Sequence, residues 1–481
     1  MRDHLILWVN DTRHEVRGGD AFLMLADWLR ERLGLTGTKV MCAEGDCGVC
    51  TVLVAEPVAP SEPPRYLPID SCLRFLFQLD GCHVVTVDGL ARNGALAPVQ
   101  QAMIDCHGSQ CGFCTPGMVM TLTGGCHAAK AGADLDWRQE LSGNLCRCTG
   151  YVSIFEAAAQ ARRAPDWLAD RFANSAWMPE AARRRRESLE VHGELGGVPM
   201  RVSSPATLPE ALAARRQPGA RVVAGATDLG VLWNQGKLRP QHWLDLSRLP
   251  ALRGIHLEEK DGQAVLVAGS LATWTGLLEA CREELPQAVP ILEAFGGPQI
   301  RHVGTLGGNL VNGSPIADSL PLLFALEATL DLASATGTRS VPIEAFYQGY
   351  RQVDLGADEL LVGVRMPLPR PGDRLRLVKV SRRRDLDIST FTSALLLRRA
   401  GDRIATARLA CGGVGPTVVR LRRTEEFLAG RPFTEDSFRQ AGDVAAAEIQ
   451  PITDVRGSAE YRRQLARGVL LKFFHQEVAP A

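Results

Sequence analysis

The sequence has few aromatic residues, no excess of either charge and no long apolar run. Phe, Trp and Tyr make up 6% of its 481 residues, and 54 Lys and Arg balance 54 Asp and Glu. Because this composition offers no broad basic surface, we expect neither nucleic acid nor anionic lipid as a partner. No window approaches the ~20 apolar residues of a membrane span. We therefore expect neither a nucleic-acid-binding protein nor a membrane protein.

The N-terminal segment lacks the features of a secretion signal. Its apolar run, Leu5 to Val9, is too short for a signal-peptide core, and no small-residue cleavage site follows it. Thirteen cysteines in a chain without an export signal indicate metal or redox chemistry in a reducing compartment rather than disulfides. We expect a cytoplasmic protein.

The cysteines are crowded into the first third of the chain. Eleven of the thirteen precede Gly150, and only Cys281 and Cys411 follow it. Cysteines that serve only as small buried apolar residues would be scattered along the chain. The length predicts about three domains. The cysteine distribution indicates that the part of the chain before Gly150 differs in character from the part after it.

The first group of cysteines has the spacing of a plant-type [2Fe-2S] site. The pattern is C-x4-C-x2-C, followed by a fourth cysteine, at Cys42, Cys47, Cys50 and Cys72. Gly45 and Gly48 permit the backbone turns that bring amides toward the sulfur atoms. Four thiolates also suit zinc, which remains the alternative, but the x4 gap and the glycine-rich loop favour iron-sulfur.

The segments around this loop predict a small mixed fold. Leu5 to Val9, the turn at Asn10 and Asp11, and Glu15 to Arg17 indicate a hairpin, whereas Ala21 to Leu33 has helical periodicity. Thr51 to Val54 is typical of a strand. This order predicts the β-grasp fold of plant-type ferredoxins.

A second group of cysteines lies in two longer motifs. They read QCGFCTPG from Gln110 to Gly117 and GNLCRCTGY from Gly143 to Tyr151, with candidate ligands at Cys111, Cys114, Cys146 and Cys148. Both motifs resemble the second iron-sulfur domain of the molybdenum hydroxylases, the xanthine dehydrogenase and aldehyde oxidase family. The resemblance implies a small helical bundle that holds the cluster between facing helices, and it implies that Gln110 hydrogen-bonds a molybdenum pterin.

The periodicity agrees with a helical domain. Met118 to His127 and Phe155 to Arg162 are predicted helices, so two ligand cysteines would lie at the start of one helix and two before the other. Without the motif, Gln110 could equally be a polar helix cap. Cys82, Cys106 and Cys126 match no ligand position, and we interpret them as core or incidental thiols.

Residues 164–196 are the expected interdomain linker. Clear periodicity is lost from Ala164 to Pro205, a stretch that includes the run Arg183 to Arg186. An arginine run could bind phosphate or an acidic partner, but we interpret this one as a solvated part of the linker.

Two glycine-rich segments follow the linker. The first, Arg221 to Gly230, is a strand that turns into a loop of small residues able to bring backbone amides to a phosphate; it is not the GxGxxG of a Rossmann fold. The second runs from Pro298 to Asp318 and contains GTLGGN and SPIAD. Together they could bind a pyrophosphate from both sides. The pair resembles the FAD domain of the same family.

That resemblance assigns candidate FAD contacts by position. Two loops would bind the phosphates, Asp318 a polar part of the cofactor, and Phe295 the isoalloxazine ring. Alone, Asp318 would be interpreted as the N-cap of a helix over Leu320 to Leu326, and Phe295 as a core aromatic. The loop residues are Val222, Val223, Ala224, Gly225, Ala226, Thr227, Asp228 and Leu229, then Thr305, Leu306, Gly307, Gly308 and Asn309.

The C-terminal part, from about Arg374 to Phe474, resembles the last module of the family's flavin unit. In that module a lysine, here Lys379, and residues near an Asp-Ile pair, here Asp387 and Ile388, approach the flavin. The spacing departs from the family pattern around Arg384, so Arg382 to Arg384 could instead be a solvated turn.

The predicted fold class is multidomain α+β. It comprises a β-grasp ferredoxin-like domain over 1–85, a helical [2Fe-2S] domain over 86–163, the linker over 164–196, a two-part α+β FAD-binding domain over 197–370 and an α/β C-terminal flavoprotein module over 371–481.

The resemblance also implies a direction of electron flow. Electrons would come from molybdenum, cross the second cluster and then the first, and reach FAD, which can pass a hydride to NAD. Nothing in the chain resembles the molybdenum-binding region, which would lie on a larger partner subunit. The order of domains resembles the small subunit of two-subunit bacterial members of the family, which implies an α2β2 heterotetramer that oxidises hypoxanthine and xanthine to urate.

Several alternatives stay open at this stage. The complex could act on aldehydes or N-heterocycles, and oxygen rather than NAD could reoxidise the flavin. A self-contained NADH-dependent flavin and iron-sulfur reductase is a second class, although the motif around Gln110 argues against it. A zinc-binding scaffold without activity is a third.

Overall fold

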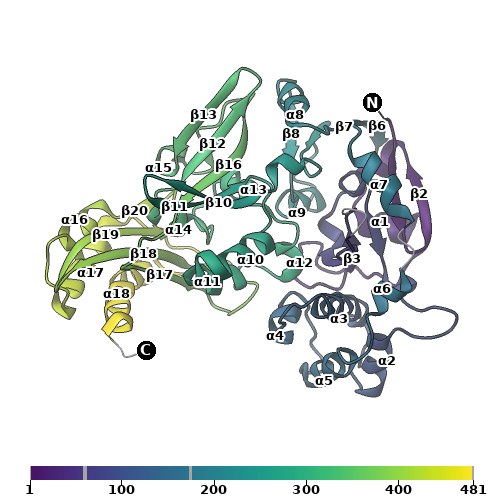
Figure 1. The fold of residues 1–481 in the computed structure, drawn as a ribbon, viewed down its shortest axis with the longest axis horizontal. Coiled ribbons are helices and arrows are strands. Elements are labelled where there is room, and N and C mark those ends of the chain that lie inside the picture. Colours follow the sequence, from purple (N-terminus) through teal and green to yellow (C-terminus); the bar gives the residue numbers. More distant parts are fainter. Residues whose placement is uncertain (1, 58–61, 173–175, 479–481) are drawn as a thin grey trace. The chain divides into compact units, whose positions relative to one another are not determined.

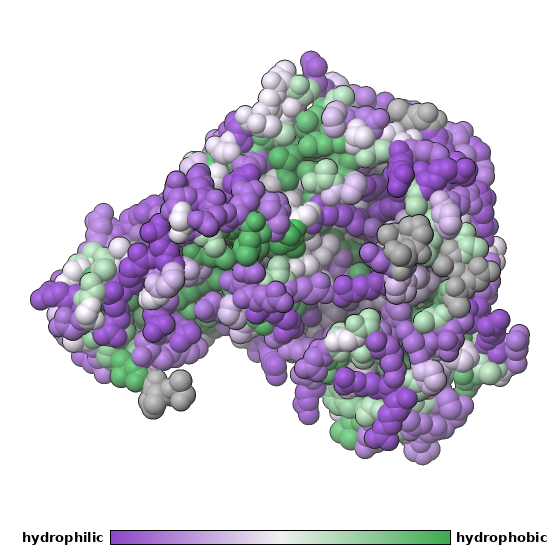
Figure 2. Space-filling view, in the orientation of Figure 1, coloured by the Kyte–Doolittle hydropathy of each residue, from purple (hydrophilic) through white to green (hydrophobic). Residues whose placement is uncertain are grey.

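The computed structural model describes residues 2–57, 62–172 and 176–478. The chain forms two compact units, of which one comprises Met1–Pro250 with Gly296–Gly304 and the other Ala251–Phe295 with Thr305–Ala481. Among the described residues, no helix combines the length and the apolar character needed to cross a membrane. Hydrophilic residues predominate on the face shown in Figure 2.

The first unit begins with the predicted ferredoxin-like sheet (Figure 1). Its strand order is β2(Thr12–Val16), β1(Leu5–Val9), β5(His83–Val85), β3(Thr51–Ala55), β4(Leu67–Asp70). β1 and β5 run parallel, and the other neighbours are antiparallel. The predicted hairpin and the strand at Thr51 are confirmed; the predicted helix is shorter, α1(Leu25–Glu31), and follows a 3₁₀ turn over Gly18–Phe22. This is the β-grasp arrangement.

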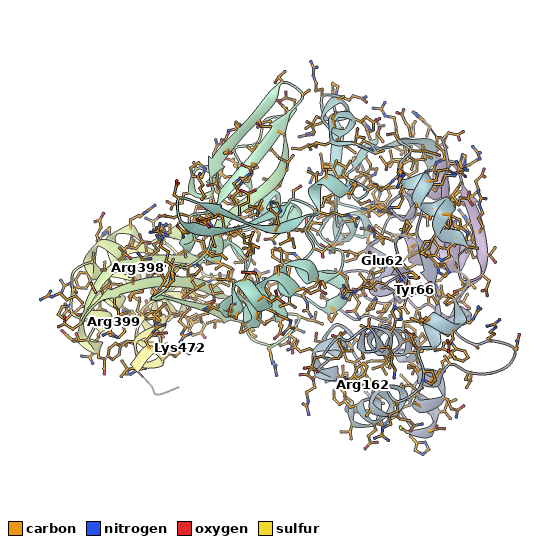
Figure 3. All side chains as sticks on the ribbon, in the orientation of Figure 1. Glu62, Tyr66, Arg162, Arg398, Arg399 and Lys472 are labelled. Carbon is orange, nitrogen blue, oxygen red and sulfur yellow. The ribbon has the colours of Figure 1, made fainter. Side chains whose placement is uncertain are left out.

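A group of helices follows this sheet. In chain order they are α2(Pro98–Asp105), α3(Thr115–Lys130), α4(Trp137–Glu140), α5(Val152–Ala161), α6(Trp167–Arg171) and α7(Trp177–Arg185). α3 and α5 confirm the two predicted helices. Tyr66, labelled in Figure 3, is buried where the helices meet the sheet, with its ring against His127 of α3 and His83 of β5.

The structure corrects the expectation that residues 164–196 form a solvated linker. α6, α7 and the first strand of the next sheet fall within residues 164–196. Arg185 is part of the packed interior, where its guanidinium donates to the Cys82 Sγ at 3.4 Å and pairs with Glu56 at 3.1 Å. Sequence periodicity missed α7 because its buried face is short, with Trp177, Met178 and Ala181 preceding the arginines.

A second sheet completes the first unit. Its order is β6(Leu189–Leu195), β7(Val198–Ser204), β9(His242–Asp245), β8(Ala220–Val223), with parallel pairing of β9 to both β7 and β8. The helices with it are α8(Leu208–Arg215) and α9(Leu229–Asn234). The helix α12(Pro298–Arg301), from far along the chain, also belongs to this unit and packs against β4 of the first sheet.

The second unit contains two antiparallel sheets. One has the order β10(Ile255–Lys260), β11(Gln263–Gly269), β16(Leu360–Pro367), β12(Thr329–Ser334), β13(Gly337–Pro342), and the other β17(Asp373–Val380), β18(Phe391–Ala400), β19(Arg403–Gly412), β20(Val419–Arg420). A short hairpin pairs β14(Tyr347–Gly349) with β15(Gln352–Val353). The helices are α10(Trp274–Glu284), α11(Val289–Glu293), α13(Leu306–Asn312), α14(Leu320–Ala325), α15(Ile343–Phe346), α16(Arg422–Leu428), α17(Glu435–Glu448) and α18(Ala459–Val478).

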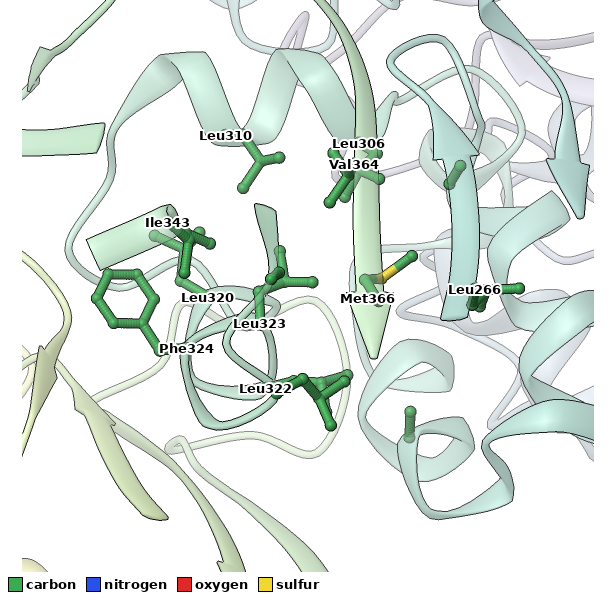
Figure 4. Close-up of a cluster of buried hydrophobic side chains, with 14 of the residues drawn as sticks. Leu266, Leu306, Leu310, Leu320, Leu322, Leu323, Phe324, Ile343, Val364 and Met366 are labelled. Atoms are coloured by element: carbon green, nitrogen blue, oxygen red, sulfur yellow. The ribbon is translucent and has the colours of Figure 1, made fainter. Parts of the chain in front are cut away.

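Alternating side chains of β18 hold the second unit together. Ala394 and Leu396 join the core cluster around α14, part of which Figure 4 shows, whereas Leu395 and Leu397 join the cluster that contains Phe438 of α17. Successive residues of a strand point to opposite faces, so β18 contributes to two cores. The C-terminal module is thereby continuous with the sheet that precedes it.

Candidate functional site

The first predicted cysteine group combines three cysteines of the loop between α1 and β3 with Cys72, which lies in the 3₁₀ turn after β4. The Cys42 thiol contacts those of Cys47 and Cys72, and Cys50 also contacts Cys72. All but the half-buried Cys42 are buried. Hydrogen bonds from the neighbouring thiols hold the pKa of Cys42 far below its usual range and raise those of Cys47 and Cys72. The loop therefore stabilises thiolate at its most accessible cysteine.

The loop backbone has the shape that the glycines predicted. Ala43, Gly45 and Gly48 have φ angles of 53°, 77° and 63°, and the Glu44 N–H donates to Cys42 Sγ at 3.4 Å. Such turns aim amides at sulfur and are typical of iron-sulfur loops.

The second cysteine group lies where two helices begin, as predicted. Cys114 is the N-cap residue of α3, and Cys146 and Cys148 precede α5. Its thiols contact in two pairs, Cys111 with Cys148 and Cys114 with Cys146. Cys111 and Cys148 are exposed, whereas Cys146 is buried. This group therefore opens to the surface.

Hydrogen bonds around Cys146 favour its thiolate. Burial alone would raise the pKa of this thiol, but hydrogen bonds from Thr149 and the Cys148 backbone outweigh burial and leave the pKa below its ordinary value. Tyr151 has φ of 69°; its hydroxyl accepts from the Cys146 N–H at 2.8 Å and donates to the Asn144 carbonyl at 2.9 Å.

The contacts of the thiols in the second group fit a two-iron group. Within residues 2–57, 62–172 and 176–478, no three His, Cys, Asp or Glu side chains are placed so that one metal ion could bind them. A structural zinc needs four ligands around one point, whereas a [2Fe-2S] cluster distributes four cysteines over two irons. The two thiol pairs of the second group match the second arrangement, whereas the first group forms one series of contacts through Cys42 and Cys72.

The two cysteine loops touch each other. The Leu145 N–H donates to the Cys47 carbonyl at 2.9 Å, and Asn144 Nδ2 donates to the Gly48 carbonyl at 3.0 Å. A Cβ on Gly48 would lie 2.3 Å from the Gly143 oxygen, so only glycine permits this approach. A short path of backbone and hydrogen bonds therefore connects the two cysteine groups within the first unit.

Gln110 is exposed and precedes Cys111. The N-cap of α3 is Cys114, so Gln110 is not the helix cap that its residue type alone would suggest. Cys82 is buried, and Cys106 and Cys126 are half-buried.

The first predicted phosphate loop follows β8 and leads into α9, so the strand-to-loop prediction is confirmed. Gln78 Nε2 donates to the Ala224 carbonyl at 2.6 Å, and Arg74 Nη1 to that of Gly225 at 3.5 Å. A Cβ on Gly225 would lie 2.2 Å from the Val303 oxygen. Ala226 has φ of 64°. These hydrogen bonds and close contacts fix the backbone of the loop, which suits a loop that binds phosphate through its backbone amides.

Sequence reasoning missed the residues that connect this loop to the first cysteine group. Asn234 of α9 donates to the carbonyls of Ala43 and Cys72, each at 2.9 Å. Arg74 and Gln78 interrupt the apolar run Leu73 to Leu79, and polar side chains in such a run were the available signal. Asp70 is also buried beside Cys50, and burial raises its pKa well above the usual value.

The second predicted loop begins α13 in the other unit. Thr305 caps this helix by accepting from the Gly308 N–H at 3.1 Å. A Cβ on Gly307 would lie 2.7 Å from the Ser270 oxygen, and Asn309 Oδ1 accepts from Ser319 at 2.6 Å. The glycines again permit close backbone packing.

Asp318 and Lys379 form a buried ion pair in the second unit. The Lys379 Nζ lies 2.6 Å from Asp318 Oδ2, both side chains are 8% exposed, and Ser389 donates to Asp318 Oδ1 at 2.5 Å. The N-cap of α14 is Ser319, so Asp318 is not the cap that the sequence alone would suggest. The half-buried Phe295 packs on Trp274, with ring centroids 4.4 Å apart. In the turn beyond Lys379, Asp387 accepts from the Arg383 N–H, whereas Ile388 is 53% exposed.

Three family models match successive parts of the chain. They are described as a [2Fe-2S] binding domain over residues 86–159, the FAD binding domain in molybdopterin dehydrogenase over 198–369, and the CO dehydrogenase flavoprotein C-terminal domain over 376–477.

Curated relatives match nearly the whole chain. Xanthine dehydrogenase 1 of Arabidopsis thaliana is 30% identical over 98% of this chain and 39% of its own length, and aldehyde oxidase 1 of Bos taurus is 29% identical over 98% and 39%. The chain thus spans about two fifths of the length of these relatives.

Solved structures resemble part of the chain. Carbon monoxide dehydrogenase from Hydrogenophaga pseudoflava, in a form lacking the Mo-pyranopterin moiety, has a TM-score of 0.53 and 29% identity over 56% of this chain and 94% of its own. Quinoline 2-oxidoreductase from Pseudomonas putida 86 has a TM-score of 0.52 and 28% identity over 57% and 94%.

Proposed function

We propose that this chain belongs to the molybdenum hydroxylase family as an iron-sulfur and FAD subunit, and that it transfers electrons from a molybdenum centre on a partner chain through two [2Fe-2S] clusters to FAD. The observation that carries the proposal is that a backbone hydrogen bond, from the Leu145 N–H to the Cys47 carbonyl, joins the two four-cysteine groups. An electron-transfer chain needs such adjacent sites.

The cluster ligands are the eight predicted cysteines. In the second site their contacts support the pairs Cys111 with Cys148 and Cys114 with Cys146. In the first site Cys42 contacts both Cys47 and Cys72, and Cys50 contacts Cys72. Cys111 and Cys148 are exposed and lie next to the exposed Gln110. This exposure supports the proposal that the second site faces the molybdopterin of the partner chain.

FAD would be bound by the two glycine loops, Val222 to Leu229 and Thr305 to Asn309, with Phe295, Asp318 and Lys379. When bound, the flavin supplies the exchange between single electrons and hydride that links iron-sulfur sites to a nicotinamide. The chain's own residues shape the loops: Gly225 and Gly307 have no room for a side chain. Asp318 and Lys379 would offer buried charge and hydrogen bonds to the cofactor's polar atoms.

The partner and substrate follow from the relatives. We propose a large molybdopterin-binding subunit, an α2β2 assembly, oxidation of hypoxanthine and xanthine, and NAD as acceptor. The xanthine dehydrogenases among the matches support this choice. The matches to aldehyde oxidase and quinoline 2-oxidoreductase keep aldehydes and N-heterocycles as competing substrates.

Spectroscopy and copurification test the proposal in separate steps. The reduced chain should give two distinct [2Fe-2S] EPR signals together with flavin absorbance, and the chain should copurify with a molybdenum-containing partner. A colourless zinc protein, or a chain that reduces a soluble carrier from NADH without a partner, contradicts the electron-transfer role. Absence of xanthine-dependent NADH formation by the purified complex contradicts only the substrate.

A further inference from the structure

Residues Gly296–Gly304 belong to the first unit, although their chain neighbours on both sides belong to the second. This segment contains α12, whose Ile300 packs beside Cys50 and Cys72. His302 Nδ1 also lies 2.7 Å from the Pro68 carbonyl of β4. A piece of the flavin-binding sequence is thus built into the iron-sulfur part of the protein.

Gln299 is the most deeply buried polar residue of this segment, with no exposed surface. Its Nε2 donates to Asn144 Oδ1 at 2.7 Å and to Thr121 Oγ1 at 3.1 Å. Thr121 in turn donates to Asn144 Oδ1 at 2.8 Å, so two donors fix the Asn144 amide. The other end of that amide donates to the Gly48 carbonyl.

The Asn144 amide lies next to the contact between the two cysteine loops. Its residue precedes Leu145, whose N–H donates to the Cys47 carbonyl, and Gly48 follows Cys47. Two adjacent carbonyls of the first loop are therefore held by two adjacent residues of the second. Gln299 sets the position of this four-residue contact through Asn144.

Packing alone does not account for a glutamine at this position. Gln299 Oε1 has no hydrogen-bond partner within the described parts of the chain, and a Cβ on Gly143 would lie 1.9 Å from it. A buried polar atom without a partner is costly, and an apolar side chain of the same shape would fill the space without that cost. The donor Nε2 is the part that the surroundings use.

We infer that Gln299 is a positioning residue for electron transfer between the two clusters. This inference rests on the proposed function. By fixing Asn144, Gln299 keeps the Leu145 N–H on the Cys47 carbonyl. Gln299 thereby sets the distance between the two clusters, one on Cys111, Cys114, Cys146 and Cys148 and the other on Cys42, Cys47, Cys50 and Cys72. In each transfer the former is oxidised by one electron and the latter is reduced by one; no bond is made or broken.

The test compares three variants of the full chain, reduced with dithionite and examined by low-temperature EPR. Gln299→Met keeps the size and removes the donor, and Thr121→Val removes the second donor to Asn144. Thr123→Val is the matched control, since Thr123 is buried on the same helix but donates only to the Val119 carbonyl at 2.7 Å. The readout is the splitting that two neighbouring paramagnetic clusters impose on each other's signals.

We expect Gln299→Met and Thr121→Val to retain both cluster signals at full intensity with a smaller or unresolved splitting. Thr123→Val should match the parent chain. Unchanged splitting in both test variants overturns the inference, and if Gln299→Met does not fold, Thr121→Val decides alone. A parent chain without two [2Fe-2S] signals instead overturns the proposed function, and this inference with it.

Discussion

The backbone N–H of Leu145 donates to the carbonyl oxygen of Cys47 at 2.9 Å, which joins the residue before one proposed cysteine ligand to another proposed ligand 98 positions earlier. No side chain takes part in this bond, so no residue type in the sequence announces it. It depends on Gly48, which lets the backbones of the two loops approach.

Replacement of Gly48 should therefore cost more than its backbone angle alone would predict. Gly34 and Gly48 both have left-handed φ angles, 68° and 63°, but a Cβ on Gly34 has nothing within 4 Å, whereas one on Gly48 would lie 2.3 Å from the Gly143 oxygen. Gly34→Ala should lower the free energy of unfolding by ~1–2 kcal/mol. Gly48→Ala should lower it by several kcal/mol more and reduce the iron content, as measured by denaturant titration and iron analysis. Equal effects of the two changes would contradict a tight contact between the loops.

Loss of one ligand in either cysteine group should remove one cluster and leave the other. Cys72→Ser and Cys148→Ser should each retain about half of the parent iron and one of two EPR signals. Cys106→Ser is the control, because Cys106 only donates a hydrogen bond to Gln160 and serine can replace that donor. If Cys72→Ser and Cys148→Ser abolish the same signal, the division into two sites is wrong.

The Asp318–Lys379 pair should be sensitive to removal of one partner. Asp318→Asn leaves the ammonium of Lys379 buried without its counter-charge, which costs on the order of 3–5 kcal/mol in buried pairs. The FAD content should fall with it, since both residues are proposed FAD contacts. Arg282→Met, which breaks the exposed pair between Arg282 and Glu293, should change stability by less than about 1 kcal/mol. A fully stable, FAD-replete Asp318→Asn chain would refute the assignment.

Gly225→Ala should impair FAD retention through the shape of the loop. The new methyl would meet the Val303 oxygen at 2.2 Å and displace the backbone that follows β8. Gly254→Ala is the control, since a Cβ there has nothing within 4 Å. The ratio of flavin to protein after gel filtration measures the effect, and an unchanged ratio in Gly225→Ala would argue against this loop as a phosphate cradle.

His83 should make the protein less stable in acid. Burial lowers its pKa to about 4, and its Nε2 lies 2.6 Å from the Asn10 carbonyl, which can only accept, so Nε2 carries the proton and Nδ1 accepts from Tyr66. Below its ordinary pKa of ~6.5 the unfolded chain binds a proton that the folded chain does not bind until about pH 4. The free energy of unfolding should therefore fall as the pH drops through this window, by at most roughly 3 kcal/mol from this group.

Denaturant titrations at pH 7.5 and 5 check this pH dependence. His83→Gln should flatten it, whereas His192→Gln, at an exposed position, should leave it as in the parent chain. A His83→Gln variant with the parent slope would mean that other groups govern acid stability.

Local sequence was sufficient to predict which cysteine thiols the structure brings together and the elements around them. The spacing of Cys42, Cys47 and Cys50 and the glycines between them define a loop by themselves, because the ligands lie within a few residues of one another. The helices that carry the second group were likewise predicted from periodicity, which depends only on neighbours along the chain.

The linker and Asp318 required the folded chain. From its neighbours in sequence, Arg185 would be expected to be solvated, but it is largely covered because Glu56 and Cys82, more than a hundred residues earlier, lie beside it. Asp318 has the position of a helix cap, yet Lys379 and Ser389 arrive from β17 and the turn after it. Charge and capping patterns describe a residue's neighbours in sequence and cannot reveal a partner that folding brings from elsewhere.

The sequence by itself determined the predictions of which cysteines would bind iron and which loops would approach a phosphate, since both depend on short spacings and on glycine. Only the tertiary structure decided how the two cysteine groups meet, because the bond from Leu145 to Cys47 and the hydrogen bonds of Gln299 to Asn144 join segments far apart in the chain. Contacts of that kind depend on the packing of the whole unit, which leaves no periodic signal in any one of the segments it unites.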